Sequence, residues 1–249
     1  MLLKIDYSNL LNIYIPACAL VFYFIEKNFP ERPINIKKEF SKDIAAFAAL
    51  TILGPFFATP LANYYKTFHF NALEFIYQMH PVFRVLLASL ITDFLNYWVH
   101  YCMHKYSWYW KVHLFHHRVV NLYWFSGLRA SVLHYISFIM VRITVGLLLF
   151  QLSTSELFYY FAIGFTFNSY QHTNSKTTLK FVEWIFVTPR FHRLHHSSQG
   201  RKLKNIGTVF SFWDRMFGTY LDPETAGTGY ELGIKAKSDK FSFKEFIGY

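Results

Sequence analysis

The chain has 249 residues, of which 53% are hydrophobic, 21% aromatic and only 16% charged. This composition excludes a disordered chain and is more apolar than that of most soluble proteins, so we expect an integral membrane protein. The formal net charge of +10 admits either a nucleic acid or a membrane surface as a partner. The two cysteines, Cys18 and Cys102, lie far apart in or beside apolar stretches and indicate no disulfide framework.

Three apolar runs precede the first histidine motif. The first covers residues 10–24 and has no small-residue cleavage pattern after it, so we expect a retained helix rather than a signal peptide. Residues 27–43 form a polar, charged loop. The second run covers residues 44–61, where a glycine and two prolines are expected to kink the helix or end it early. The third run, residues 82–99, leads directly into the histidines.

Two further apolar runs, residues 131–152 and 157–171, are separated by Ser153-Thr-Ser-Glu156. This segment has the Ser-x-x-Glu form of a capping box, and its shortness predicts a helical hairpin. The remainder, residues 173–249, is polar and basic and has no run long enough to span a bilayer. We therefore predict an all-α fold, an integral membrane bundle of about four to five apolar helices.

The distribution of basic residues predicts the orientation of this multi-pass bundle. If the last two runs form a hairpin, the histidine-rich segments 104–130 and 173–249 lie on the same side of the membrane. Of the 25 Lys and Arg residues, 21 then fall on that side. The positive-inside rule places the histidine side in the cytoplasm. Because the charge follows membrane sidedness, we expect no nucleic-acid partner. His69 and His80 fall on the opposite side and are not expected to bind a metal.

Histidines recur at steps of three and four, the spacings that place side chains on one helix face. The motifs are His100-x3-His104, His113-x2-His116-His117 and His192-x2-His195-His196. Thr188-Pro189 is typical of a helix start, which predicts that the last motif is helical. Within each HxxHH, the adjacent pair is about 100° apart and can diverge toward two different ions. A solvated basic helix face would explain one such motif, but not all of them together.

Asp93 and Tyr97 continue the stripe of His100 and His104 toward the apolar part of the third run. A carboxylate in a membrane helix usually has a partner, and we expect the N–H of a ligating imidazole. A site rich in nitrogen and without thiolates suits Fe, Zn, Cu or Ni. Eight histidines in the motifs are more than one ion can use, so we expect a pair of ions.

The ordered motif set resembles the sterol desaturase / fatty acid hydroxylase superfamily. It comprises Asp93-x3-Tyr97-x2-His100-x3-His104, the two HxxHH groups, and Trp213-Asp214-x2-Phe217-Gly218-Thr219. The resemblance covers about residues 80–220. It implies a membrane bundle whose cytosolic helical cap holds two histidine-bound iron ions, with zinc as a possible substitute in isolated protein. Proteins of this kind use O₂ and electrons to hydroxylate, desaturate or cleave lipids.

The same resemblance implies further site residues. Gln171-His172-Thr173 fits the superfamily and makes His172 an additional ligand. Many members carry His-Pro-x-Glu where this chain has Ala130 to His134, so His134 is a possible ligand or a replacement for that glutamate. Asn168 is a possible further ligand, with helix packing as its alternative role. Asn121-Leu122 and Leu128-Arg129-x-Ser131-Val132-Leu133 give a narrower likeness to the alkylglycerol monooxygenase branch.

The expected division is residues 1–79 for N-terminal membrane helices, 80–220 for the catalytic domain and 221–249 for a polar basic tail. The expected partners are a lipid substrate, the membrane and a separate electron donor, because no segment resembles a fused haem domain. That donor is cytochrome b5-like, ferredoxin-like or, in the alkylglycerol branch, a pterin. Two readings stay open beside a hydroxylase or desaturase: an ether-lipid-cleaving monooxygenase and a membrane protein that binds metal without redox chemistry.

Overall fold

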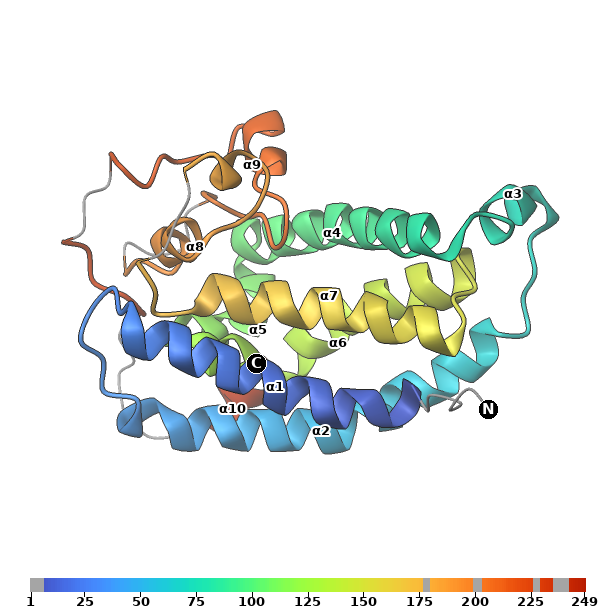
Figure 1. Cartoon of the computed structure of the whole chain (residues 1–249). Helices are drawn as coiled ribbons and strands as arrows, with labels where there is room; N and C mark the ends of the chain where they lie inside the picture. Colours follow the sequence, from blue (N-terminus) through green and yellow to red (C-terminus); the bar gives the residue numbers. More distant parts are fainter. Residues whose placement is uncertain (1–6, 177–179, 199–202, 226–228, 235–241) are drawn as a thin grey trace.

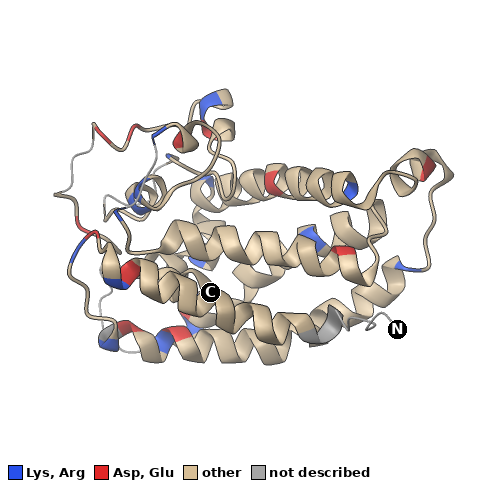
Figure 2. Ribbon diagram, in the orientation of Figure 1, with Lys and Arg blue, Asp and Glu red and all other residues tan. Residues whose placement is uncertain are grey.

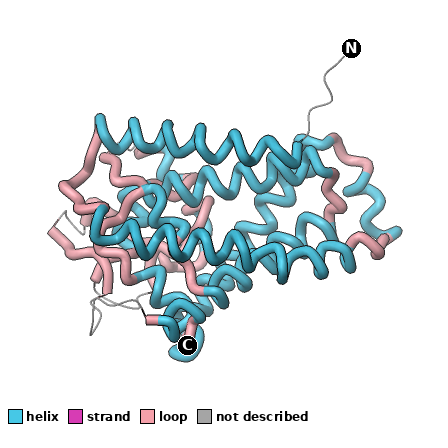
Figure 3. The backbone as a smooth tube through the Cα atoms, turned by 90° about the horizontal axis from the view of Figure 1, so that it is seen from below, coloured by secondary structure: helices cyan, strands magenta, loops and turns pink. Residues whose placement is uncertain are grey.

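The computed structural model describes residues 7–176, 180–198, 203–225, 229–234 and 242–249 (Figure 1). Its regular elements within these ranges are all helices, as the hydrophobic pattern predicts. Long helices lie side by side in an elongated bundle, with a cap of short helices and loops at one end and α3 at the other. Figure 3 shows most of the loops gathered at the cap end.

The N-terminal pair consists of α1 (Tyr7–Asn28) and α2 (Lys37–Tyr65). α2 continues through Pro55 and Pro60, so the expectation that it ends early is wrong. A bundle tolerates these prolines because neighbouring helices and local adjustments satisfy the freed backbone groups. Gly54 serves close packing here, since a Cβ at this position would lie 2.5 Å from the hydroxyl oxygen of Tyr135.

A short 3₁₀ turn, η1 (Asn71–Leu73), and α3 (Glu74–Tyr77) lead into α4 (Pro81–Lys105). His80 caps α4, since its side chain accepts a hydrogen bond from the backbone N–H of Val82, and Pro81 occupies the first turn. α4 is longer than the apolar run that predicts it. It therefore carries the first histidine motif on the same rigid helix that crosses the bundle.

The hairpin predicted from the last two apolar runs is confirmed. α6 (Val132–Ile143) passes into the π-helical segment η3 (Thr144–Leu149), and α7 (Thr154–His172) follows. The predicted capping box is present, with Ser153 and Glu156 exchanging side-chain and backbone hydrogen bonds. Arg84 of α4 also donates two hydrogen bonds, at 2.6 and 2.5 Å, to the carboxylate of Glu156. This buried ion pair joins α4 to the hairpin at the end far from the cap.

Within the part of the chain that the structure describes, four helices are long and apolar enough to cross a membrane. They are the segments Leu10–Asn28, Glu39–Tyr65, Pro81–Lys105 and Val132–Leu149. α7 is not in this set, although it packs between α1 and α4 (Figure 1). Charged residues gather near the cap end, and few interrupt the long helices (Figure 2). The prediction of a membrane bundle is thereby confirmed, with four candidate spans where about four to five were expected.

The cap is built from short elements that follow the long helices. They are α5 (Ser107–His117), η2 (Trp124–Leu128), η4 (Val182–Trp184), α8 (Pro189–His195), α9 (Phe212–Met216) and α10 (Phe243–Ile247). The described part of the expected tail packs onto this cap. Leu232 joins a small core with Val119 and Leu122, and Phe246 of α10 packs against Phe115. Arg201 and Lys202 of the polar, basic segment 173–249 lie outside the described residues.

Candidate metal centre

Four elements bring nine histidines together at the cap end of the bundle. α4 ends there with the first motif, α5 and α8 each carry an HxxHH, and α7 ends with His172. The predicted start of α8 is confirmed, since the Thr188 side chain accepts a hydrogen bond from Phe191 N and Pro189 occupies the first turn. All nine histidine side chains are buried.

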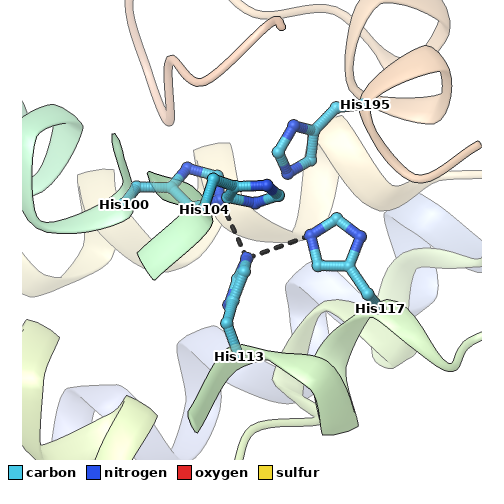
Figure 4. Close-up of side chains that lie close together, drawn as sticks. All are labelled: His100, His104, His113, His117 and His195. Carbon is cyan, nitrogen blue, oxygen red and sulfur yellow. Dashed lines mark hydrogen bonds between the residues drawn. The ribbon is translucent and has the colours of Figure 1, made fainter. Parts of the chain in front are cut away.

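Five of the histidines form one group, whose potential ligand nitrogens all lie within 4.8 Å of one another. Its members come from α4, α5 and α8 and are shown in Figure 4: His100, His104, His113, His117 and His195. The Nε2 atom of His113 lies 2.9 Å from Nε2 of His100 and 3.0 Å from Nε2 of His117. The rings therefore point into one shared space.

The other four histidines form a second group, from α5, α7 and α8: His116, His172, His192 and His196. Nε2 of His172 lies 3.3 Å from Nε2 of His116 and 3.0 Å from Nε2 of His192. His196 completes the group, with Nε2 3.1 Å from Nε2 of His192. The two groups touch, because the ring centroids of His117 and His196 are 4.4 Å apart.

Adjacent histidines in each HxxHH diverge, as the helical spacing predicts. The ring planes of His116 and His117 differ by 87°, and those of His195 and His196 by 83°. His117 and His195 face the group of five, while His116 and His196 face the group of four. Each HxxHH motif therefore supplies histidines to both groups.

Backbone carbonyls orient four of the nine imidazoles through Nδ1. His100 donates to Ile206 O at 2.6 Å and His195 to Lys204 O at 3.0 Å. In the other group, Nδ1 of His116 lies 2.8 Å from Arg129 O and Nδ1 of His172 lies 2.6 Å from Asn168 O. An imidazole that donates through Nδ1 leaves the lone pair of Nε2 for a metal.

The donor geometry fits a metal ion in each group. Two nitrogens about 2.1 Å from one ion, at angles between octahedral and tetrahedral, lie roughly 2.9–3.4 Å apart. The Nε2 pairs described above lie 2.9 to 3.3 Å apart, and all the ligand nitrogens of each group lie within 4.8 Å of one another. Nε2 of His195 is buried and has no hydrogen-bond partner among the described residues, although its Nδ1 is bonded. An unpaired buried nitrogen of this kind is costly unless it binds an ion.

The electrostatic environment favours neutral imidazoles. Burial lowers the pKa of His116 to about 4, and burial likewise lowers the pKa of His195 to about 4. Burial also drives the pKa of His113, His117 and His192 well below the ordinary value. Neutral rings are the metal-binding form of histidine, so the groups are ready to bind cations near neutral pH.

Asp93 has a different partner from the predicted one. Its carboxylate accepts hydrogen bonds from the Thr208 hydroxyl at 2.5 Å, from the backbone N–H groups of Val209 and Phe210, and from Trp213 Nε1 at 3.0 Å. The expectation of an imidazole partner is wrong because the loop after α8 folds back onto α4. Asp93 thus fixes the loop whose carbonyls orient His100 and His195.

A second carboxylate holds the same loop. Asp214 accepts hydrogen bonds from Ile206 N at 2.6 Å, from Gly207 N at 2.8 Å and from the Thr219 hydroxyl at 2.6 Å. Tyr97 joins this network, since its hydroxyl lies 2.8 Å from that of Thr219. Burial raises the pKa of Asp214 to about 6, so the carboxylate is ionised at neutral pH despite its position.

His134 and Asn168, the two possible ligands, lie beside the histidine groups rather than within them. His134 Nδ1 is 3.2 Å from Nδ1 of His113, on the side of that ring away from its Nε2 contacts. The Asn168 side chain donates to Gly127 O at 3.0 Å. His69 pairs with Glu74 of α3 at 3.2 Å, at the end far from the cap.

Sequence reasoning missed a buried charge cluster next to the group of four. The Arg129 side chain, 1% exposed, donates to Asp43 at 2.5 Å and to Glu39 at 2.6 Å. Tyr123 donates to the same Asp43 carboxylate at 2.7 Å. α2 begins at Lys37, within the segment predicted as a loop, and its first turns bring Glu39 and Asp43 to Arg129. The signal was their spacing of four next to an apolar run.

Comparison with known proteins gives relatives for this arrangement. The sequence profile of the fatty acid hydroxylase family matches residues 85–219. Ornithine lipid hydroxylase OlsE of Rhizobium tropici is 29% identical over 169 residues, which cover 66% of this chain and 49% of the relative. Alkylglycerol monooxygenase of Homo sapiens is 31% identical over 148 residues, which cover 53% of this chain and 29% of the relative.

A plant protein shows a similar degree of likeness. Very-long-chain aldehyde decarbonylase GL1-9 of Oryza sativa subsp. indica is 28% identical over 146 residues, which cover 56% of this chain and 55% of the relative. The chain thus spans about half or less of the length of most curated relatives described here. No solved structure matches it.

Proposed function

The chain belongs to the fatty acid hydroxylase family, and from this premise we propose that it is a membrane-bound di-iron oxygenase that hydroxylates or desaturates a lipid. The observation that carries the proposal is the pair of histidine groups, with five and four members, buried side by side at one end of a membrane bundle. The ligands proposed are the nine histidines of these groups. Two adjoining nitrogen sites suit two cations.

Iron fits this donor set on chemical grounds. Imidazole suits Fe as well as Zn and Cu, and nine neutral rings hold two cations without adding negative charge. Bound iron would supply the redox chemistry that activates O₂ against an unactivated C–H bond. Zinc would occupy the same nitrogens without that redox chemistry. The proposal therefore predicts activity with iron and none with zinc.

The protein residues have separate roles in this proposal. Carbonyls of Ile206, Lys204 and Arg129 hold the Nδ1 protons of three rings, so that each ring presents Nε2. His134 does the same for His113 from inside α6, where a carboxylate would be costly to bury. It acts as an orienting partner rather than as a tenth ligand.

Water is kept from the group of five by aromatic packing. The ring of Trp110 lies 5.0 Å from that of His104 and 5.1 Å from that of His117, measured between centroids. An apolar wall of this kind limits solvent access and tunes the redox potential of a bound metal. Such a wall suits an oxygenase, in which water near the metals would compete with the lipid for the oxidant.

The proposal places the site on the cytoplasmic side, because the histidine side carries most of the Lys and Arg residues. A separate electron donor, such as a cytochrome b5-like protein, a ferredoxin or a pterin, would reduce the metals. An ether-lipid-cleaving reaction is the second candidate. The 31% identity to human alkylglycerol monooxygenase favours it.

Lipid mass spectrometry of cells with and without the gene tests the proposal. We expect a lipid that gains one oxygen atom, or loses two hydrogens, and that disappears with the His195→Ala variant. His69→Ala is the matched control, since His69 lies outside both groups. An alkylglycerol that accumulates when the gene is removed would indicate ether cleavage instead. Unchanged lipids in cells whose protein carries two iron ions per chain would refute an oxygenase.

A further inference from the structure

An open pocket lies beside the metal centre, on the outer side of α4. It has a volume of about 420 Å³ and is lined by Tyr101, Leu203, Lys204, Phe217, Gly218 and Thr219. Its size falls within the range of ligand-binding pockets. Two of its lining residues neighbour the group of five through the backbone, because Tyr101 follows His100 on α4 and the Lys204 carbonyl accepts the Nδ1 hydrogen bond of His195.

The polar side of the pocket is positively charged. The Lys204 ammonium donates to Gly218 O at 3.4 Å, a long bond that leaves its other donors available. Lys105 adds a second cation near one lining residue, with Nζ 5.5 Å from the ring centroid of Tyr101. None of the six described lining residues is a carboxylate. A pocket with this charge attracts an anionic group.

The apolar side of the pocket continues onto the membrane helix α4. Phe217 packs against Trp98 with ring centroids 4.9 Å apart, and Trp98 is 37% exposed on a candidate membrane span. Met216, next to Phe217, is 64% exposed. Trp and Tyr gather where a membrane meets water. A ligand in this pocket would therefore have an anionic end near Lys204 and an apolar end along the outside of α4.

We propose that this pocket binds the phosphate headgroup of an anionic phospholipid, with Lys204 and Lys105 on the phosphate and the acyl chain against Phe217 and Trp98. The conclusion that this lipid is the substrate rests on the proposed function, whereas the binding itself does not. A lipid is favoured over an acidic protein because the cationic rim adjoins an exposed aromatic surface of a membrane helix.

The test is lipid binding to the whole protein loaded with zinc in detergent, so that no turnover occurs. The probes are short-chain phosphatidic acid, phosphatidylcholine with the same chains, and inorganic phosphate. We expect phosphatidic acid to bind best and Lys204→Gln to weaken its binding about tenfold, the effect of one lost charged contact. Lys105→Gln should weaken it by a smaller factor. Lys111→Gln is the matched control, since Lys111 also lies over a tyrosine ring but away from the pocket.

The other outcomes overturn either the headgroup site or the proposed function, and each can be told from the rest. Equal binding of the two phospholipids, unaffected by Lys204→Gln, would show that no headgroup site exists. Inorganic phosphate binding as tightly as phosphatidic acid would indicate a free anion site. If Lys204→Gln left lipid binding unchanged but weakened the binding of an acidic electron-donor protein, the pocket would be a donor-docking surface. Selective binding by a protein that oxidises no lipid would refute the proposed function and keep the site.

Discussion

Replacing Arg129 with methionine tests how the N-terminal helices support the metal centre. The Arg129 guanidinium holds two carboxylates, those of Asp43 and Glu39, which are 0% and 5% exposed. Removing the guanidinium leaves both of them buried without their cation. Breaking a buried ion pair in this way costs roughly 3–5 kcal/mol, a large part of the stability of a typical domain. We expect a comparable loss in the free energy of unfolding.

The metal centre should respond in the same variant. The Arg129 carbonyl accepts the Nδ1 hydrogen bond of His116, so any shift of this backbone segment turns a ring of the group of four. We expect Arg129→Met to retain less metal per folded chain than the wild type. A triple variant, Arg129→Met with Asp43→Asn and Glu39→Gln, should recover most of the stability, because no buried charge is then left unpaired.

Denaturant titration in detergent micelles, followed by circular dichroism, measures the loss, and metal analysis of the folded fraction measures the site. Arg118→Met is the matched control. Arg118 pairs with Glu245 at 2.6 Å, but both side chains are about one-fifth exposed, so the expected loss is at most about 1 kcal/mol. Equal losses in the two variants, or no recovery in the triple variant, would refute the assignment of Arg129 as the support of this region.

Two further predictions concern pH and the loop after α8. The pKa values of His116 and His195 fall from 6.5 to about 4 on folding, so their contribution to stability is complete above about pH 6.5 and is lost as the pH falls through about 4. Because protons and a bound cation compete for the same nitrogens, metal release followed with a colorimetric chelator should set in only as the pH approaches about 4 or falls below it, and release already complete at pH 6 would contradict this. Asp214→Asn leaves one backbone N–H facing an amide group, which should cost about 1–3 kcal/mol and lower metal affinity roughly tenfold or more. Asp222→Asn is its control, and the difference between Asp214→Asn and the wild type should shrink below about pH 6, where burial leaves the wild-type carboxyl protonated.

The sequence predicts most of the scaffold because the relevant signals are local. Apolar runs mark the long helices, and the capping box between Ser153 and Glu156 marks the hairpin. Steps of three and four place histidines on one face of α4, α5 and α8. Thr188-Pro189 predicts the start of α8 for the same reason, since a cap and a first-turn proline act within one turn.

The partners of those histidines are less predictable, because they are mostly backbone carbonyls. Every residue except proline offers the same carbonyl and N–H pair, so nothing in the sequence marks Ile206 or Lys204 as the acceptor for a ring on a distant helix. The error at Asp93 follows from this. A buried carboxylate beside a histidine motif suggests an imidazole partner, but the imidazole donates to a carbonyl and the carboxylate holds the loop that carries it.

There is a physical reason why carbonyls bind the imidazoles while carboxylates bind the loop. A carboxylate bonded directly to a metal-bound ring would add negative charge beside the ion, whereas a carbonyl orients the ring and adds only a dipole. Asp93 and Asp214 act through the backbone, and so does Arg129 with its two carboxylates. The Asp214 charge thus stands one peptide away from the ring of His100, since it binds the N–H of Gly207 and the carbonyl of that same peptide, Ile206 O, holds His100. Removing these side-chain charges should loosen the site without changing the donor atoms, which separates their effect from that of removing a histidine.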